Sequence, residues 1–179
     1  MKEIVKPVIS KEEIENKVSE LAKIISEDYK GEEVTLICTL KGAVVFMVDL
    51  AKKLELDAVK LEFIQASSYV GGTSSTGVIN IIKDLNTNLE GKNVIIIEDI
   101  IDTGLTSKYL FEYFRTMNPK SLKICTLLYK ECKKEEQNIL DVDYIGFHID
   151  DFFVIGYGLD YEDRYRNLDF VGELSFVEE

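Results

Sequence analysis

The sequence predicts an α/β fold in which helices flank a mainly parallel sheet, with a flexible antiparallel flap and a small hood built from the chain ends. Four β-branched apolar residues in a row, at positions 94–97, show no alternation, which indicates a strand covered on both faces of a parallel sheet. Helical and strand-like segments alternate along much of the chain, as is typical of this class. A length of 179 residues, 46% of them hydrophobic, suits a single domain over residues 1–179.

The first predicted element is a helix over residues 11–28. Ser10 and Glu13 have the spacing of a capping box, and apolar residues follow at helical spacing as far as Ile25. An apolar strand is expected over residues 34–39 and a second helix over residues 43–54.

A hairpin is expected next, with strands over residues 59–67 and 77–82. The segment between them, residues 68–77, holds three glycines and five serine or threonine residues. Such a composition buries too little apolar area to be rigid, so it predicts a flexible tip.

The second half of the chain is richer in strands. A helix with an apolar face from Leu105 to Met117 ends at Asn118 and Pro119. Strands are then expected over residues 122–129, 144–148 and 169–177, with a charged loop over residues 131–137.

The charge balance limits the classes of partner. Lysine and arginine number 21 against 33 aspartate and glutamate residues, a net charge of −12, which argues against a general nucleic-acid partner or an anionic membrane surface. An anionic substrate would need local cations or a metal ion, which points to Mg²⁺.

Cysteine and histidine usage adds further limits. Cys38, Cys125 and Cys132 fit no metal or redox spacing and indicate reduced thiols in the cytoplasm. His148, the single histidine, lies in a strand-like run and favours a structural role. No apolar run reaches the length of a membrane span, and the charged amino terminus lacks a signal-peptide core.

Three carboxylates follow the central apolar strand. Glu98 and Asp99 are adjacent, and Asp102 comes three residues later, followed by small hydroxyl residues and Gly104 before a helical pattern. Backbone N–H groups at such a helix start favour a bound phosphate. The stretch therefore suggests a phosphorylated sugar, with its hydroxyls on Glu98 and Asp99 and its phosphate on the loop; for Asp102 and Thr103 the alternative is an ordinary helix N-cap.

Residues 98–104, Glu-Asp-Ile-Ile-Asp-Thr-Gly, resemble the phosphoribosyl-pyrophosphate (PRPP) motif of the phosphoribosyltransferases, and specifically that of the hypoxanthine-guanine phosphoribosyltransferases. The resemblance extends from about residue 5 to 177 and rests on four separated motifs in one order. It implies the phosphoribosyltransferase type I fold and an enzyme of purine salvage. The implied reaction is Mg²⁺-dependent transfer of the 5-phosphoribosyl group from PRPP to hypoxanthine or guanine, giving IMP or GMP and pyrophosphate.

The resemblance also implies roles for individual residues. Asp102 would be the catalytic base, and Ser68 and Tyr69 would belong to a lid that excludes water. A non-proline cis peptide would join Leu40 to Lys41. PRPP and its phosphates would be bound by Glu98, Asp99, Asp102, Thr103, Gly104, Leu105, Thr106, Lys41, Gly42 and Arg166. The purine would be bound by Lys130, Phe153, Val154 and Asp160, and the metal by Glu98, Asp99 and Asp160. Leu105 departs from the pattern, since some members carry a polar side chain there.

Several of these residues have a simpler explanation. Lys41 can be a solvated turn residue, Lys130 the first of a charged run, and Phe153 a core aromatic. Asp160 can belong to a solvated acidic loop, and Arg166 can form a salt bridge.

Two other functions compete with the transferase. A non-catalytic regulator could sense PRPP and bind nucleic acid on the same fold, but the chain has no basic stripe. A nucleotide-binding redox enzyme would need a Gly-x-Gly-x-x-Gly motif, which the sequence lacks. The expected partners are therefore PRPP and a 6-oxopurine, without nucleic acid or membrane, in a homo-oligomer that is a dimer or a tetramer.

Overall fold

The computed structural model describes residues 2–68, 79–130 and 140–177. The elements run in the order β1 (Lys2–Ile9), α1 (Lys11–Asp28), β2 (Val34–Thr39), α2 (Val44–Lys53), β3 (Val59–Ser68), β4 (Ile79–Lys83), β5 (Asn93–Ile101), α3 (Leu105–Arg115), β6 (Ser121–Lys130), β7 (Tyr144–Ile149), β8 (Val154–Ile155) and β9 (Val171–Val177). Among the described residues, no helix combines the length and hydrophobicity needed to span a membrane.

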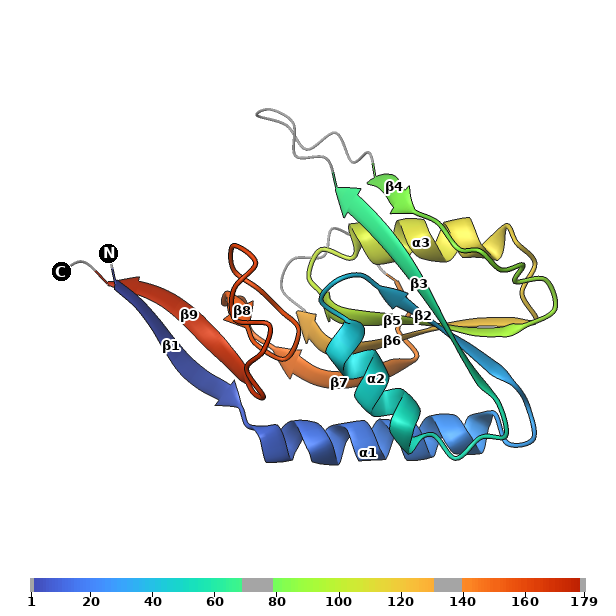
Figure 1. Ribbon diagram of the computed structural model, residues 1–179, viewed down its shortest axis with the longest axis horizontal. Helices are drawn as coiled ribbons and strands as arrows, with labels where there is room; N and C mark the ends of the chain where they lie inside the picture. The colour runs from blue at the N-terminus through green and yellow to red at the C-terminus, as the bar shows by residue number, and fades with distance from the viewer. Residues whose placement is uncertain (1, 69–78, 131–139, 178–179) are drawn as a thin grey trace.

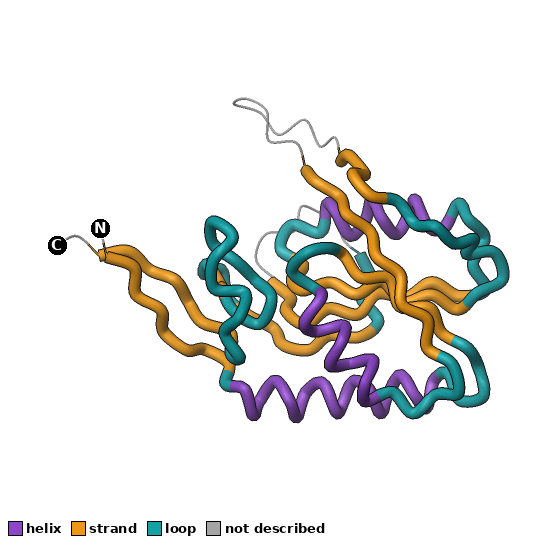
Figure 2. The backbone as a smooth tube through the Cα atoms, viewed as in Figure 1, coloured by secondary structure: helices purple, strands orange, loops and turns teal. Residues whose placement is uncertain are grey.

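The main sheet has the strand order β4-β3-β2-β5-β6-β7, and only the β3–β4 pair in it is antiparallel. Helices α1 and α2 pack on one face, and α3 covers the other (Figures 1 and 2). The predicted α/β class, with a mainly parallel sheet between helices, is confirmed.

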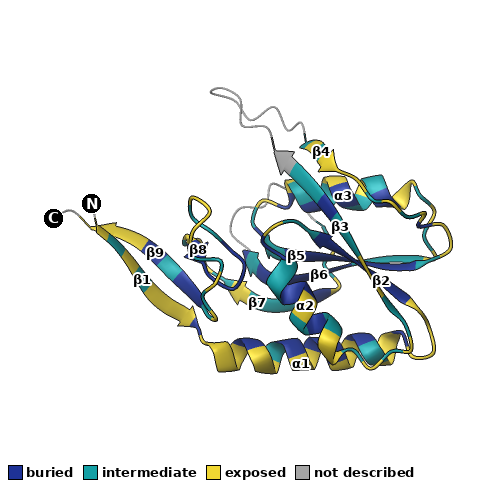
Figure 3. Cartoon of the chain, viewed as in Figure 1, coloured by how far each residue is buried: buried dark blue, intermediate teal, exposed yellow. Residues whose placement is uncertain are grey.

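Strand β5 is buried on both faces, which explains its lack of alternation. Ile95 and Ile97 join the core beneath α1 and α2, whereas Val94 and Ile96 pack with residues of α3. Figure 3 shows the dark, buried strands at the centre of the sheet. The strand continues to Ile101, so Glu98 and Asp99 lie within it and not beyond its end.

Local signals placed the first helix accurately. Helix α1 begins at Lys11, and the side chain of Ser10 accepts a hydrogen bond from the backbone N–H of Glu13 while Glu13 accepts one from Ser10, so the predicted capping box is present. Helix α2 covers the predicted range within one residue at each end.

The hood is a second, antiparallel sheet with the order β1-β9-β8. Lys2 pairs with Val177 at one end of the β1–β9 ribbon, so the two chain ends lie side by side, away from the main sheet (Figure 1). The expected hood from the chain ends is therefore present, although β1 itself was not predicted as a strand.

The flap is the antiparallel β3–β4 pair, in which Ser68 is the register partner of Ile79. The predicted tip and Tyr69, one of the two expected lid residues, lie outside the described residues. Ser68 ends β3 at the same edge of the sheet at which the parallel strand β2 ends.

Candidate active site

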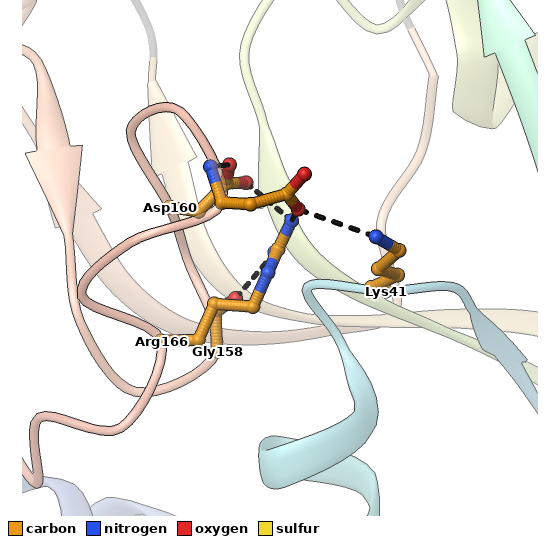
Figure 4. Close-up of polar contacts among 5 residues, drawn as sticks. Lys41, Gly158, Asp160 and Arg166 are labelled. Carbon is orange, nitrogen blue, oxygen red and sulfur yellow. Dashed lines mark hydrogen bonds and ion pairs between the residues drawn. The ribbon is translucent and has the colours of Figure 1, made fainter.

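Several of the side chains predicted to form the site lie at the carboxyl edge of the parallel strands. Lys41 follows β2, Asp102 follows β5, and Lys130 ends β6. Because β2, β5 and β6 are parallel neighbours, these three positions share one edge, where ligands of α/β proteins bind. The hood loop, residues 156–166, faces this edge and supplies Asp160 and Arg166 (Figure 4).

Glu98 and Asp99 are held in a poorly solvated part of the site. Burial, assisted by the charge of Asp99, raises the pKa of Glu98 to about 8, although the Ser107 hydroxyl donates a hydrogen bond of 3.0 Å to its Oε1. Burial also raises the pKa of Asp99, which accepts a bond of 2.8 Å from the N–H of Ile100. A cation would therefore favour the ionised form of both groups.

Asp102 and Lys130 place an acceptor beside a donor. The Lys130 side chain is only 7% exposed, and its ammonium lies 3.7 Å from Asp102 Oδ2 and 3.3 Å from Asp151 Oδ1. The other oxygen of Asp102, Oδ1, is buried and has no hydrogen-bond partner among the described residues. Since a buried acceptor without a donor is costly, this oxygen is suited to receive an N–H from a ligand. The burial of Lys130 excludes the solvated-run alternative.

The loop after Asp102 leads directly into α3. Gly104 is the N-cap, with a left-handed φ of 80°, and the Thr103 hydroxyl accepts a weak bond of 3.5 Å from the N–H of Leu105. The ordinary N-cap alternative for Asp102 and Thr103 is therefore wrong. The first turn of α3, which includes Thr106, begins beside the acidic end of β5.

Lys41 and Gly42 form a turn that approaches β5 very closely. The Leu40–Lys41 peptide is cis, as the resemblance implied. A Cβ at Gly42 would lie 1.5 Å from Asp99 Oδ2, so a side chain at this position has no room. Gly158 of the hood loop also approaches this turn closely, because a Cβ at Gly158 would lie 2.1 Å from the Gly42 carbonyl oxygen. Two glycines thus bring the hood loop, the β2 turn and β5 into contact.

Arg166 is the centre of a polar network in the hood loop. It lies 2.6 Å from Asp160 Oδ1 and 3.2 Å from Asp163 Oδ1, and its Nη1 donates to the Gly158 carbonyl at 2.8 Å (Figure 4). Lys41 reaches the same Asp163 oxygen from across the site, at 3.2 Å. The alternative of a salt bridge for Arg166 is thus observed. Asp160 is half-buried and paired with Arg166, so it does not belong to a solvated loop. Lys41 is exposed, but it is paired with Asp163 and is not a free turn residue.

The hood loop contains several non-glycine residues in the left-handed backbone conformation, which such residues rarely adopt. Non-glycine residues with positive φ are Tyr157 at 49°, Glu162 at 52°, Asp163 at 57° and Tyr165 at 75°. Such conformations are costly and cluster where the surrounding structure holds a functional segment in place. A contact that holds this loop in place is the hydrogen bond of 2.8 Å that the Tyr157 hydroxyl donates to Asp49 Oδ2 of α2.

Phe153 presents an exposed ring beside a buried backbone. It is 51% exposed, so the core alternative is wrong, and its ring meets Tyr161 edge-on with centroids 5.8 Å apart. Val154 is buried in β8, and the Phe153 carbonyl accepts a bond of 2.9 Å from Leu174. The aromatic face is therefore fixed and available to a planar ligand.

The described residues contain no group of three or more histidine, cysteine, aspartate or glutamate side chains arranged to hold a metal ion. Mg²⁺ does not need such a cage, because it is commonly bound by one or two carboxylates together with substrate phosphates and water. Glu98 and Asp99 are oxygen donors whose pKa values are raised by burial, and Asp160 lies on the facing loop. This donor set fits Mg²⁺ carried in with a phosphorylated substrate.

The structure adds residues that sequence reasoning passed over. Ser107 orients Glu98, Asp151 contacts Lys130, Gly158 supports Arg166, and Asp163 joins Arg166 to Lys41. The pattern of two glycines around Tyr157 was a usable signal for Gly158. The Asp151–Lys130 and Asp163–Lys41 contacts join residues 21 and 122 positions apart, which no local pattern indicates.

Known protein families, proteins and solved structures resemble this chain over most of its length. Residues 9–162 match the family model described as phosphoribosyl transferase domain. The hypoxanthine-guanine phosphoribosyltransferase of Bacillus subtilis is 46% identical over 173 residues, which is 97% of this chain and 94% of that protein. The protein of the same name from Streptococcus thermophilus is 43% identical over 176 residues, 97% of this chain and 95% of its own. A crystal structure of a hypoxanthine-guanine phosphoribosyltransferase from Bacillus anthracis has a TM-score of 0.89 and 42% identity, and the match covers 98% of this chain and 100% of that one.

Proposed function

Because the chain belongs to the phosphoribosyl transferase domain family, we propose that it catalyses one reaction of purine salvage. It transfers the 5-phosphoribosyl group of PRPP to hypoxanthine or guanine and releases IMP or GMP with pyrophosphate. The relatives named above carry the names of such transferases, which supports this reaction over the non-catalytic regulator.

The pairing of Asp102 with Lys130 carries the proposal. A 6-oxopurine presents its oxo group and the N–H of its five-membered ring on neighbouring positions of one edge. Lys130 can only donate, which suits the oxo group, and the unpartnered Oδ1 of Asp102 can only accept while ionised, which suits the N–H. Adenine has an amino group in place of the oxo group and meets Lys130 with a second donor.

The proposed mechanism needs no covalent nucleophile. The reaction breaks the bond from the ribose anomeric carbon to pyrophosphate and forms a bond from that carbon to the five-membered-ring nitrogen that is remote from the oxo group, through a transition state like an oxocarbenium ion. Asp102 accepts the proton from the other nitrogen of that ring, the one beside the oxo group, and Lys130 stabilises charge that develops on the oxo group. Phe153 stacks on the purine, and the backbone of Val154 contacts its edge.

The remaining residues bind PRPP. Arg166 and Lys41 bind pyrophosphate as cations, the Gly42 backbone lies beside it, and the loop from Asp102 to Thr106 holds the 5-phosphate, with Gly104 and Leu105 offering backbone donors. Glu98 and Asp99 contact the ribose hydroxyls. Ser68 and Tyr69 belong to the lid that excludes water from the reacting centre and so suppresses hydrolysis of PRPP.

Glu98, Asp99 and Asp160 would hold Mg²⁺ together with the substrate. When bound, the ion supplies positive charge that offsets the pyrophosphate and makes it a better leaving group. Chelation with excess EDTA should therefore abolish turnover, and added Mg²⁺ should restore it. Full turnover in EDTA would exclude this part of the proposal.

Steady-state assays with PRPP and four purines test the reaction. We expect kcat/KM for adenine to fall at least about a hundredfold below that for hypoxanthine, since sites built on such hydrogen bonds reject analogues strongly. Lys130→Met should narrow the gap chiefly by damaging hypoxanthine use. Comparable rates with adenine and hypoxanthine would contradict the substrate assignment.

Three further features belong to the proposal. Residues 1–179 form one phosphoribosyltransferase domain, working in the cytoplasm, which the free and buried thiols of Cys38 and Cys125 support. The protein assembles as a homodimer or homotetramer, and the exposed apolar side chains of Leu105 and Tyr109, one helical turn apart on α3, support a contact surface. Sedimentation of the purified protein tests the assembly.

A further inference from the structure

Asp163 occupies a position between the two cations of the site. Its Oδ1 lies 3.2 Å from the ammonium of Lys41 and 3.2 Å from the guanidinium of Arg166. These two cations come from different parts of the chain, the turn after β2 and the hood loop. One carboxylate oxygen thus connects the two sides of the site.

A carboxylate and a phosphate interact with lysine and arginine side chains in the same way. Both present negatively charged oxygens that accept charge-assisted hydrogen bonds from these side chains. The proposed function assigns Lys41 and Arg166 to pyrophosphate. Asp163 and pyrophosphate therefore need the same two donors, and like charges cannot share them without repulsion.

We propose that the Asp163 carboxylate competes with pyrophosphate for Lys41 and Arg166. The carboxylate must leave these two cations for PRPP to bind, and it returns to them as pyrophosphate departs. The inference rests on the proposed function, because that function places pyrophosphate at these cations. It assigns to Asp163 the task of weakening product binding.

The energetics of the contact suit a reversible role. The side chains of Lys41 and Asp163 are 60% and 73% exposed, so water screens the attraction and keeps it weak. The two cations hold the pKa of Asp163 below its ordinary value, so the group is an anion at neutral pH. A weak anionic contact is displaced by a polyanion that makes several such bonds.

The alternative is that Asp163 positions Arg166 for the substrate, and the two roles predict opposite signs. Arg166 already has two other partners, Asp160 at 2.6 Å and the Gly158 carbonyl at 2.8 Å, which hold it without Asp163. The N–H of Asp163 donates to Asp160 Oδ2 at 2.9 Å, and this backbone contact survives any change of the side chain. Removing the carboxylate should therefore free the cations without releasing the loop.

The neighbouring residue offers a matched control. Glu162 lies in the same left-handed turn, with a φ of 52° against 57° for Asp163, and its side chain is 67% exposed. It contacts Arg164 at 3.4 Å, and its neutralisation changes net charge by the same unit as that of Asp163. Asp163→Asn suits its backbone, because asparagine tolerates the left-handed region well.

The experiment measures pyrophosphate binding by calorimetry, in the presence of Mg²⁺, for the wild-type chain, Asp163→Asn, Asp163→Glu and Glu162→Gln. We expect Asp163→Asn to bind pyrophosphate about three- to tenfold more tightly than Glu162→Gln, the size of one or two exposed ion pairs. KM for PRPP should fall by a similar factor without a rise in kcat, and Asp163→Glu should stay near the wild type.

Binding by Asp163→Asn that equals or is weaker than binding by Glu162→Gln would overturn the inference, and weaker binding would assign Asp163 the positioning role. In both cases the wild-type chain would still transfer phosphoribosyl groups, so the proposed function would stand. Absence of transfer and of pyrophosphate binding in the wild-type chain would instead overturn both.

Discussion

Glu98 on the main sheet and Asp163 on the hood loop are both carboxylates of one site, but water reaches them very differently. Glu98 is 4% exposed, and burial raises its pKa, whereas the Asp163 side chain is 73% exposed and its pKa is lowered by Lys41 and Arg166. We call Glu98, Asp99, Asp102 and Lys130 the sheet half of the candidate site, and residues 156–166 the hood half. Glu98 and Lys130 in the sheet half are buried, so their interactions are strong. The contact of Asp163 with Lys41 at the hood half is exposed and screened by water. Changes in the sheet half should therefore act on kcat, and changes in the hood half on substrate binding.

Asp102→Asn gives the largest expected effect, because Asp102 lies in the sheet half and is proposed as the base. Loss of a general base lowers a rate by about 10²- to 10⁴-fold, so kcat should fall by that factor while PRPP still binds. Single-turnover kinetics with a separate PRPP binding assay measures the two quantities. A kcat within about threefold of the parent would remove Asp102 from its assigned role.

Gly42→Ala tests the junction between the halves. Its Cβ would lie 1.5 Å from Asp99 Oδ2, so either the turn or β5 must shift. Overpacking of this kind costs about 1 to 3 kcal/mol, and we expect kcat/KM to fall by about ten- to a hundredfold. Gly31→Ala is the control, because it meets no atom within 4 Å; it should lower stability alone. Unchanged kinetics in Gly42→Ala would mean that the close contact is not needed for activity.

Tyr157→Phe removes a hydrogen bond that holds the hood half in place, without leaving a cavity. The variant keeps the ring and loses the 2.8 Å bond to Asp49, a contact worth about 0.5 to 1.5 kcal/mol. KM for PRPP should rise about two- to tenfold with kcat nearly unchanged. Tyr113→Phe removes a comparable bond to Asp84, outside the site, and should leave KM alone. A loss confined to kcat in Tyr157→Phe would contradict the division between the halves.

The smallest expected effect is the pH dependence of the stability that the Glu3–Arg164 pair of the hood contributes. Glu3 of β1 accepts bonds of 2.6 and 3.1 Å from Arg164 and a further bond from Tyr165, and the Arg164 bond is the main reason its pKa lies below the ordinary value of 4.5. The stabilisation is present above pH 4.5 and is lost as pH falls through the lowered pKa, because the unfolded chain then binds the proton more readily. Thermal unfolding between about pH 6 and about pH 3 should therefore show a shallower decline in Glu3→Gln than in the wild type. Parallel curves would show that this pair contributes nothing to stability.

Elements with strong local signals were predictable from the sequence. The capping box and the apolar periodicity located α1, and the unbroken apolar run located β5, because both signals reflect burial by neighbours on known faces. Strand β1 gave no such signal, since most of its residues are exposed and its partner is at the other end of the chain.

The same distinction applies to the site. Glu98, Asp99 and Asp102 stand in one short motif and could be selected from the sequence. The contact of Asp163 with Lys41 joins residues 122 positions apart through a left-handed turn, which no local pattern encodes. Burial of Lys130 also depends on the packing of β6 between two other strands.

The pairing of β1 with β9 means that the hood sheet can form only near the end of synthesis. Ile9 and Val171 are register partners although 162 residues separate them, so β1 leaves the ribosome long before its partner strand exists. At about 5 to 20 residues per second, the delay is roughly ten to thirty seconds. Late in that interval the nascent chain carries Asp102 and Lys130 but lacks β9, whose Leu174 N–H donates to the Phe153 carbonyl. The proposed stacking position of Phe153 is therefore completed only when β9 is translated.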